Sequence, residues 1–191
     1  MPAEIIQDDP KSYYAAAFGI GVVAAGVMTL LTWVARSASL TEFDLAMTLG
    51  TVSLFVDAPG PGVWFQGFLA VLFTGGVFGL VYAWLFEVCG CRARAWEGAL
   101  FGAVHAAIGG ALLGWIMPLM HDPIPGHPLL TNPGFMGVNY GLNTVYVFLA
   151  LHIVFGAMVG GWLHLAPLAT RHLALLYAWR HPSPPGPHVT A

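Results

Sequence analysis

Charged residues are scarce in this chain, at 8% of its 191 residues. An ordinary soluble domain has roughly a quarter, so too few charges are present here to cover a surface exposed to water. The six Lys and Arg residues form no basic patch, and nucleic acid is therefore not a predicted partner. The two cysteines, Cys89 and Cys91, are too few for a disulfide framework.

Apolar residues are abundant instead, at 58%, and they gather in four long runs. Each run approaches the roughly 20 residues that a helix needs to cross a bilayer. Because backbone groups must be hydrogen-bonded within lipid, all four runs are predicted to be helices. They cover approximately residues 14–35, 63–87, 96–120 and 143–165. The predicted fold class is all-α: an integral membrane bundle of four transmembrane helices in contact with the lipid bilayer.

Two short tails flank this predicted membrane domain, which covers residues 14–166. Residues 1–13 are polar and acidic and lack the positive segment that opens a secretory signal. The first apolar run is therefore expected to remain as a membrane helix. Residues 167–191 are predicted to be a cytoplasmic, Pro-rich tail whose end, 182–187, is disordered.

A further short helix is predicted in the first outer loop, residues 36–62. Thr41-Glu42-Phe43-Asp44 has the pattern of a capping box. Apolar residues then recur near helical spacing as far as Leu54, which indicates an amphipathic helix lying on the membrane.

The distribution of cations predicts the orientation. The side that holds both termini and the 88–95 loop carries five of the six, and the other side carries only Arg36. Because cytoplasmic loops are enriched in Lys and Arg, both termini are expected in the cytoplasm.

Glycines spaced by four residues mark predicted packing faces, as small residues let helices approach closely in lipid. The pairs are Gly75 and Gly79, Gly98 and Gly102, Gly110 and Gly114, and Gly156 and Gly160. They favour packing within one chain or between copies. A tandem duplication is a further hypothesis, because Phe18-Gly19 in the first run matches Phe101-Gly102 in the third.

Two histidines are the main candidate site residues. His105 lies on the glycine face of the third run, and His152 shares a face with Gly156 and Gly160. Each lies about nine residues, or roughly 13 Å, from one end of its helix, so both are expected near the middle of the membrane. Two facing imidazoles could ligate haem b or another buried metal. They could equally hydrogen-bond to each other or to a neighbouring hydroxyl and hold the helices together.

A second candidate site lies in the outer loops, where imidazoles and carboxylates gather. Such a set could hold copper or zinc, but no fixed ligand spacing is present, and outer loops also carry such residues for solvation. The candidate metal ligands are His121, Asp122, His127, Glu42 and Asp44.

The apolar and glycine motifs together resemble a family of small bacterial four-helix inner-membrane proteins whose function is not assigned. They are Gly26–Thr29, Phe43-Asp44 with Leu49-Gly50, Gly76–Ala83, Gly98–Gly102 and Met117–Met120. The resemblance covers roughly residues 15–165. It implies the four-helix fold and the bacterial inner membrane, and it brings no catalytic residues.

Three functions follow from these observations. The first is a non-enzymatic helix bundle that packs with its own copies, as a homo-oligomer, or serves as a subunit of a larger membrane complex. The second is an electron-transfer protein with haem or a metal held by His105 and His152. The third is a small transporter, which the possible duplication would favour.

Overall fold

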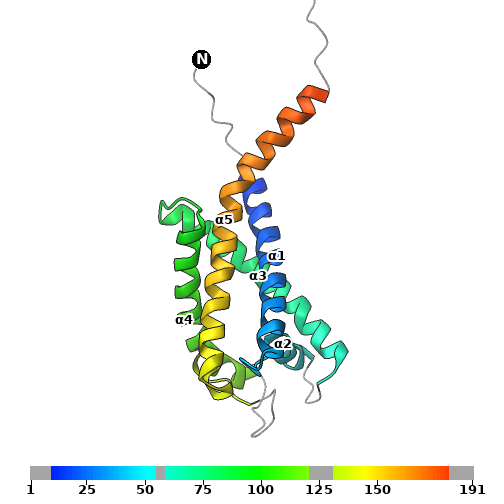
Figure 1. Ribbon diagram of the computed structural model, residues 1–191, viewed down its shortest axis with the longest axis vertical. Helices are drawn as coiled ribbons and strands as arrows, with labels where there is room; N and C mark the ends of the chain where they lie inside the picture. The colour runs from blue at the N-terminus through cyan, green and yellow to red at the C-terminus, as the bar shows by residue number, and fades with distance from the viewer. Residues whose placement is uncertain (1–9, 55–58, 121–130, 181–191) are drawn as a thin grey trace, which may run out of the picture.

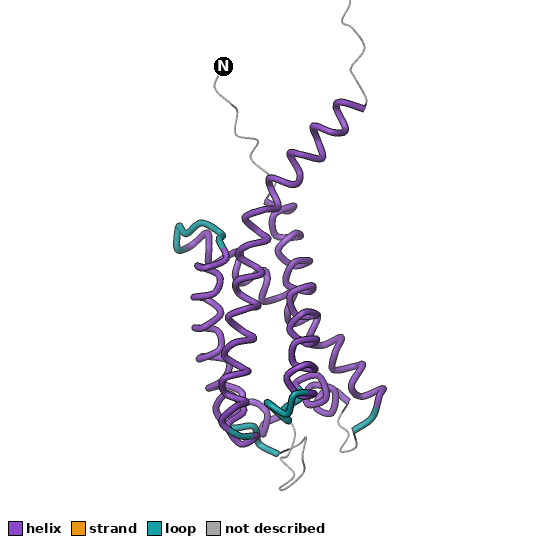
Figure 2. The backbone as a smooth tube through the Cα atoms, viewed as in Figure 1, coloured by secondary structure: helices purple, strands orange, loops and turns teal. Residues whose placement is uncertain are grey.

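The computed structural model describes residues 10–54, 59–120 and 131–180, and over these residues it is all-α (Figure 1). No strand is present in this described part of the chain (Figure 2). The elements in order are α1 (Pro10–Ser37), α2 (Leu45–Leu54), α3 (Pro61–Val88), α4 (Ala95–Met120), the 3-10 helix η1 (Phe135–Tyr140) and α5 (Leu142–Arg180). The predicted fold class is confirmed.

Four of these helices are long and apolar enough to cross a membrane. Their candidate spans are Lys11–Ser37, Pro61–Val88, Ala95–Leu119 and Leu142–Ala166. In the most apolar part of each span, only 22–33% of the residues are buried inside the chain. Many large apolar side chains are exposed along all four helices, among them Leu30, Phe73, Val104 and Tyr146, which is the pattern of helices whose surroundings are lipid. The chain is therefore a multi-pass membrane protein.

The four spans form two closely packed pairs, α1 with α3 and α4 with α5, and α1 also packs against α5. Both α2 and η1 lie at one end of the bundle, which we call the α2 end (Figure 1). The start of α1 and the connection between α3 and α4 lie at the opposite end, which we call the terminal end (Figure 1).

Glycine brings the backbones of each pair into direct contact. A Cβ atom added at Gly79 would overlap the carbonyl oxygen of Ala17, and one added at Gly156 would overlap the carbonyl oxygen of Gly98. Packing this close is what drives helix association in lipid, where apolar burial gives little drive. All the glycines of the predicted faces pack in this way against another part of the same chain: Gly75, Gly79, Gly98, Gly102, Gly110, Gly114, Gly156 and Gly160.

The glycines that suggested a duplication have similar surroundings at two of the three matched pairs. A Cβ added at Gly79 or at the matched Gly156 would overlap a backbone carbonyl oxygen of the partner helix, and one at Gly26 or at the matched Gly109 would make only ordinary side-chain contact. The third pair differs, since Gly19 has nothing within 4 Å of an added Cβ whereas a Cβ at Gly102 would overlap the carbonyl oxygen of His152. The duplication stays a hypothesis.

The predicted short helix is present as α2, and it is packed into the bundle. A Cβ at Gly67 of α3 would overlap the carbonyl oxygen of Ala46, and one at Gly50 would overlap that of Val63. The helix begins one turn later than the capping box suggested, because Asp44 is its N-cap. The Met47 N–H donates to Asp44 Oδ1 at 3.0 Å, which satisfies one of the free N–H groups of the first turn.

The last helix continues beyond the predicted end of the fourth run. Its candidate span covers Leu142–Ala166, and α5 itself extends to Arg180. The predicted boundary between bundle and tail at residue 166 thus falls within one helix. The predicted disordered end, 182–187, lies outside the described residues.

Candidate functional site

The structure brings the two predicted histidines together near the middle of the bundle. His105 lies ten residues into the α4 span and His152 ten residues into the α5 span, which places each roughly 15 Å from a membrane face at 1.5 Å per residue. Their ring centroids are 4.8 Å apart, and the ring planes are nearly perpendicular, at 89°. The expected common depth and common face are therefore both observed.

A cluster of aromatic rings surrounds the two imidazoles. Phe78 of α3 lies against the His105 ring with centroids 4.0 Å apart, and Phe148 lies against the His152 ring at 4.2 Å. The Tyr82 hydroxyl is 3.4 Å from His105 Nδ1, which is long for a hydrogen bond, and the Tyr82 side chain is almost completely buried. The sequence analysis missed these aromatic residues, although Tyr82 follows Gly75 and Gly79 on the packed face of α3.

One nitrogen of His152 is used within its own helix. His152 Nδ1 is 2.8 Å from the carbonyl oxygen of Phe148. Because a carbonyl oxygen only accepts, Nδ1 must carry the proton and donate it. In an uncharged imidazole the other nitrogen, Nε2, is then an acceptor. His152 is 7% exposed, so this acceptor is held in the interior of the protein.

A cavity of about 110 Å³ lies beside the two histidines, and we call it the histidine cavity. All five α-helices contribute to its wall, which is largely apolar and includes Phe78 and Phe155 on opposite helix pairs. No Asp, Glu, Lys, Arg or Cys side chain is among the described residues that line it.

Buried polar side chains extend from the histidine cavity toward the α2 end. Thr41 and Thr144 hydrogen-bond to each other at 2.8 Å, and Thr48 and Thr51 donate to backbone carbonyl oxygens of the Asp44–Leu54 segment. The buried polar and charged side chains of the described residues are Thr41, Asp44, Thr48, Thr51, Thr144 and His152. All of them lie between the middle of the membrane and the α2 end.

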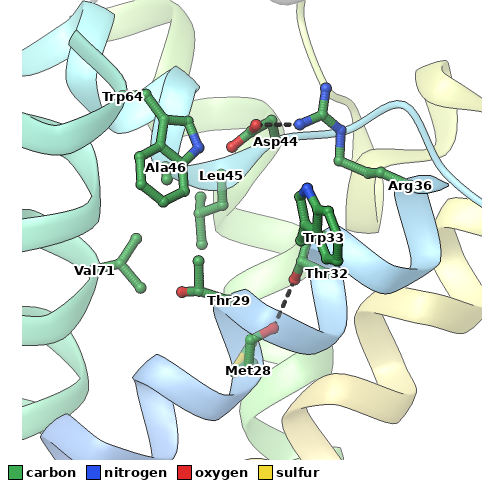
Figure 3. A pocket seen from close by; sticks show the side chains of 10 residues that line it. All are labelled: Met28, Thr29, Thr32, Trp33, Arg36, Asp44, Leu45, Ala46, Trp64 and Val71. Carbon is green, nitrogen blue, oxygen red and sulfur yellow. Dashed lines mark hydrogen bonds and ion pairs between the residues drawn. The ribbon is translucent and has the colours of Figure 1, made fainter. Parts of the chain in front are cut away.

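Two smaller cavities accompany these polar groups. One of about 50 Å³ lies beside the Arg36–Asp44 ion pair, and Trp33 and Trp64 also line it (Figure 3). The other, of about 30 Å³, lies beside Thr41 and Thr144. Met28 and Leu45 line both of them and also the histidine cavity. A cavity of this size has room for at least one water molecule where polar partners are present.

The terminal half of the bundle is packed differently. Its core cluster is formed by apolar side chains that are at most 3% exposed, among them Tyr82, Phe86, Val159 and Leu163. These side chains fill the bundle on the terminal side of the histidines. Buried polar groups are therefore fewer on the terminal side, where the Tyr82 hydroxyl and one carboxylate oxygen of Glu97 are buried.

The predicted metal ligands of the outer loops are divided by the structure. Glu42 is exposed, whereas Asp44 is buried and has both carboxylate oxygens engaged, one by the Met47 N–H and one by Arg36. His121, Asp122 and His127 lie outside the described residues. Within the described ranges, no group of three His, Cys, Asp or Glu side chains is placed to hold a metal. A copper or zinc site in these loops stays a prediction.

The arrangement of the histidines does not fit a haem between them. An iron with two axial imidazoles has a nitrogen about 2 Å away on each face of the porphyrin, which puts the ring centroids about 6 Å apart. Here the rings are 4.8 Å apart and perpendicular, so a porphyrin has no room between them. The adjoining cavity, at about 110 Å³, is also much smaller than a macrocycle requires.

The fold and site together define an α-helical, multi-pass membrane protein with a partly open cavity at mid-membrane depth. No family model, curated protein or solved structure matches this chain. The resemblance to small four-helix inner-membrane proteins accordingly depends on the sequence motifs alone.

Proposed function

We propose that this protein is a non-enzymatic membrane protein that binds a small ligand in the histidine cavity. The observation that carries the proposal is the placement of His105 and His152 in the wall of a cavity at mid-membrane depth. Polar side chains are costly in the membrane interior, and where they occur they mark functional sites by default. Helix packing alone does not explain these two, because the glycine contacts already hold α4 against α5.

Binding is favoured over passage through the bundle by the asymmetry of the core. Buried polar residues extend from the α2 end to the histidines, whereas the terminal half is filled mainly by tightly packed apolar side chains, with the Tyr82 hydroxyl and one carboxylate oxygen of Glu97 among its buried polar groups. A permeation path would need polar or hydrated surface in both halves.

Association with other copies or with a larger membrane complex is a weaker proposal. The glycine faces that suggested it are used within the chain, and the outward-facing side chains are those that lipid itself would cover. We keep the bacterial inner membrane and cytoplasmic termini as proposals, supported by the family resemblance and by the position of five of the six cations.

Filling the cavity tests the proposed function. Leu49 lines the histidine cavity from α2, whereas Leu54 of the same helix is exposed and does not line it. We expect small neutral compounds that raise the melting temperature of the detergent-solubilised wild type to act equally on Leu54→Phe and to lose their effect on Leu49→Phe. A ligand at a hundred times its Kd stabilises by about 2.7 kcal/mol, or about 5–10 °C for a chain of this length.

Two results would contradict the proposal. One is a wild-type protein that no compound in a broad library of small neutral molecules stabilises. The other is a stabilised wild type whose melting-temperature shift persists unchanged in Leu49→Phe, since the ligand would then bind elsewhere.

A further inference from the structure

We infer that the ligand of the histidine cavity is an uncharged, flat aromatic molecule with a hydroxyl group that donates a hydrogen bond to His152. This inference depends on the proposed function, and it specifies the chemistry of the ligand. Three properties of the cavity lead to it: the absence of charge in its wall, the acceptor nitrogen that the hydrogen bond to Phe148 fixes on His152, and its shape.

The absence of charge in the cavity wall selects a neutral ligand. The described residues that line it include two imidazoles and one hydroxyl, from Thr74, and no carboxylate or thiolate. A metal cation held by neutral imidazoles would keep its full positive charge at the middle of the membrane, where an unpaired charge is costly. Asp44, the buried acidic residue on the α2 side in the described part of the chain, is already paired with Arg36. An anion would find no cation in the wall.

The hydrogen bond of His152 selects a donor on the ligand. Its Nδ1–H is held by the Phe148 carbonyl oxygen, and Nε2 is left with a lone pair. A ligand with only acceptor groups would place lone pair against lone pair. A hydroxyl that donates to Nε2 would instead form a hydrogen bond with this lone pair inside the largely apolar cavity that His152 lines.

The size and walls of the cavity select a single ring. An apolar cavity of about 150 Å³ holds benzene in another protein, so about 110 Å³ limits the ligand to a single six-membered ring. Because the cavity is partly open, a molecule with one small substituent can extend into the opening. Phe78 and Phe155 supply aromatic walls, against which a flat ring packs well.

The position of Thr74 gives such a ligand a way in from the bilayer. Thr74 lines the cavity and is also exposed on the outside of α3. Because it lies within the Pro61–Val88 span, the surroundings that it faces are lipid. A neutral aromatic alcohol dissolves in the bilayer and can reach the cavity from there.

Phenol and toluene are matched probes for this inference, because they share shape and size but only phenol has a donor. In the wild type, labelled with ¹⁵N at histidine, we expect phenol to shift the Nε2 resonance of His152 and toluene to leave it in place. The ratio of phenol affinity to toluene affinity should fall about fivefold in His152→Phe, the usual effect of one neutral hydrogen bond. Both probes partition into detergent, and this effect cancels when the affinity ratio of the variant is compared with that of the wild type in the same detergent. His164→Phe is the matched control, since His164 lies on the same helix and is exposed.

Each other outcome contradicts one stated step. If phenol and toluene bind alike and neither shifts His152, the donor requirement is wrong while the cavity remains a binding site. If neither probe binds the wild type, the proposed function fails for ligands of this size. If Cu⁺ binds tightly and His152→Phe abolishes that binding, the ligand is a cation and the argument from charge is wrong. The wild-type NMR measurement decides the first two cases even if His152→Phe does not fold.

Discussion

Replacing Gly102 with alanine should separate α4 from α5 beside the histidines and destabilise the bundle. A Cβ at this position would overlap the backbone carbonyl of His152 and lie 2.9 Å from the Cα atom of Ile153. Backbone atoms cannot turn aside as a flexible side chain can, so the helices themselves must move apart. Forced overpacking of this kind costs about 1–3 kcal/mol, against a gain of about 1 kcal/mol because alanine favours the helix over glycine. The expected net loss is therefore up to about 2 kcal/mol.

Gly19→Ala is the matched control for this prediction, because Gly19 lies within α1 and has nothing within 4 Å of an added Cβ. It should gain the helix preference of alanine without the overlap. Because the helix preference of alanine is common to both, the two variants are expected to differ by the overpacking cost of about 1–3 kcal/mol, or about 2–12 °C in melting temperature for a chain of this length. The measurement is thermal unfolding of both variants in the same detergent, followed by circular dichroism. Equal melting temperatures would show that α4 and α5 do not approach as closely as described.

Three further predictions concern the α2 end. Asp44→Ala should lower the melting temperature, because it removes the N-cap of α2 and the partner of Arg36, a loss of about 1–2 kcal/mol of stability. Glu42→Ala changes an exposed residue and should alter the melting temperature little. Equal effects of the two substitutions would refute the role of Asp44 as a cap. Burial raises the pKa of Tyr140 to about 12, above the value of about 10 in an unfolded chain. The stability that its protonated phenol contributes is therefore complete below about pH 10 and is lost as the pH rises toward 12. Between about pH 10 and pH 12, the melting temperature of Tyr140→Phe should fall less than that of the wild type. If both melting temperatures fall in parallel with pH, the role of Tyr140 is contradicted. A cysteine placed at Gly126 should react with a membrane-impermeant thiol reagent in intact cells, and protection there would reverse the proposed orientation.

The four spans were predictable because lipid imposes a length and a composition that a single chain displays directly. The joint position of His105 and His152 was predictable for a related reason. Each lies at helical spacing from glycines, and glycine faces are where membrane helices meet. The depth of each histidine in the membrane then followed from the number of residues between it and the end of its helix.

The aromatic cluster and the cavity could not be predicted in the same way. In a membrane protein, the side that faces lipid and the side that faces the core are both apolar, so hydrophobic periodicity does not separate Phe78, which packs on His105, from Phe73, which is 65% exposed. The N-cap was misplaced by the capping-box pattern, because Thr41 uses its hydroxyl to bind Thr144 and the Phe43 N–H. That contact joins residues far apart in the sequence.

The glycine contacts also divide the bundle mechanically. Within α1–α3 and within α4–α5 backbone rests on backbone, which makes each pair stiff. Between the pairs, the contacts involve side chains such as Tyr82 and Phe155, whose rings lie 5.6 Å apart, and the histidine cavity lies along this seam. Side-chain contacts can adjust by changing rotamer, whereas backbone contacts of this kind cannot. The softest motion of the molecule is then a rocking of one helix pair against the other, which would widen or narrow the cavity while leaving every glycine contact in place.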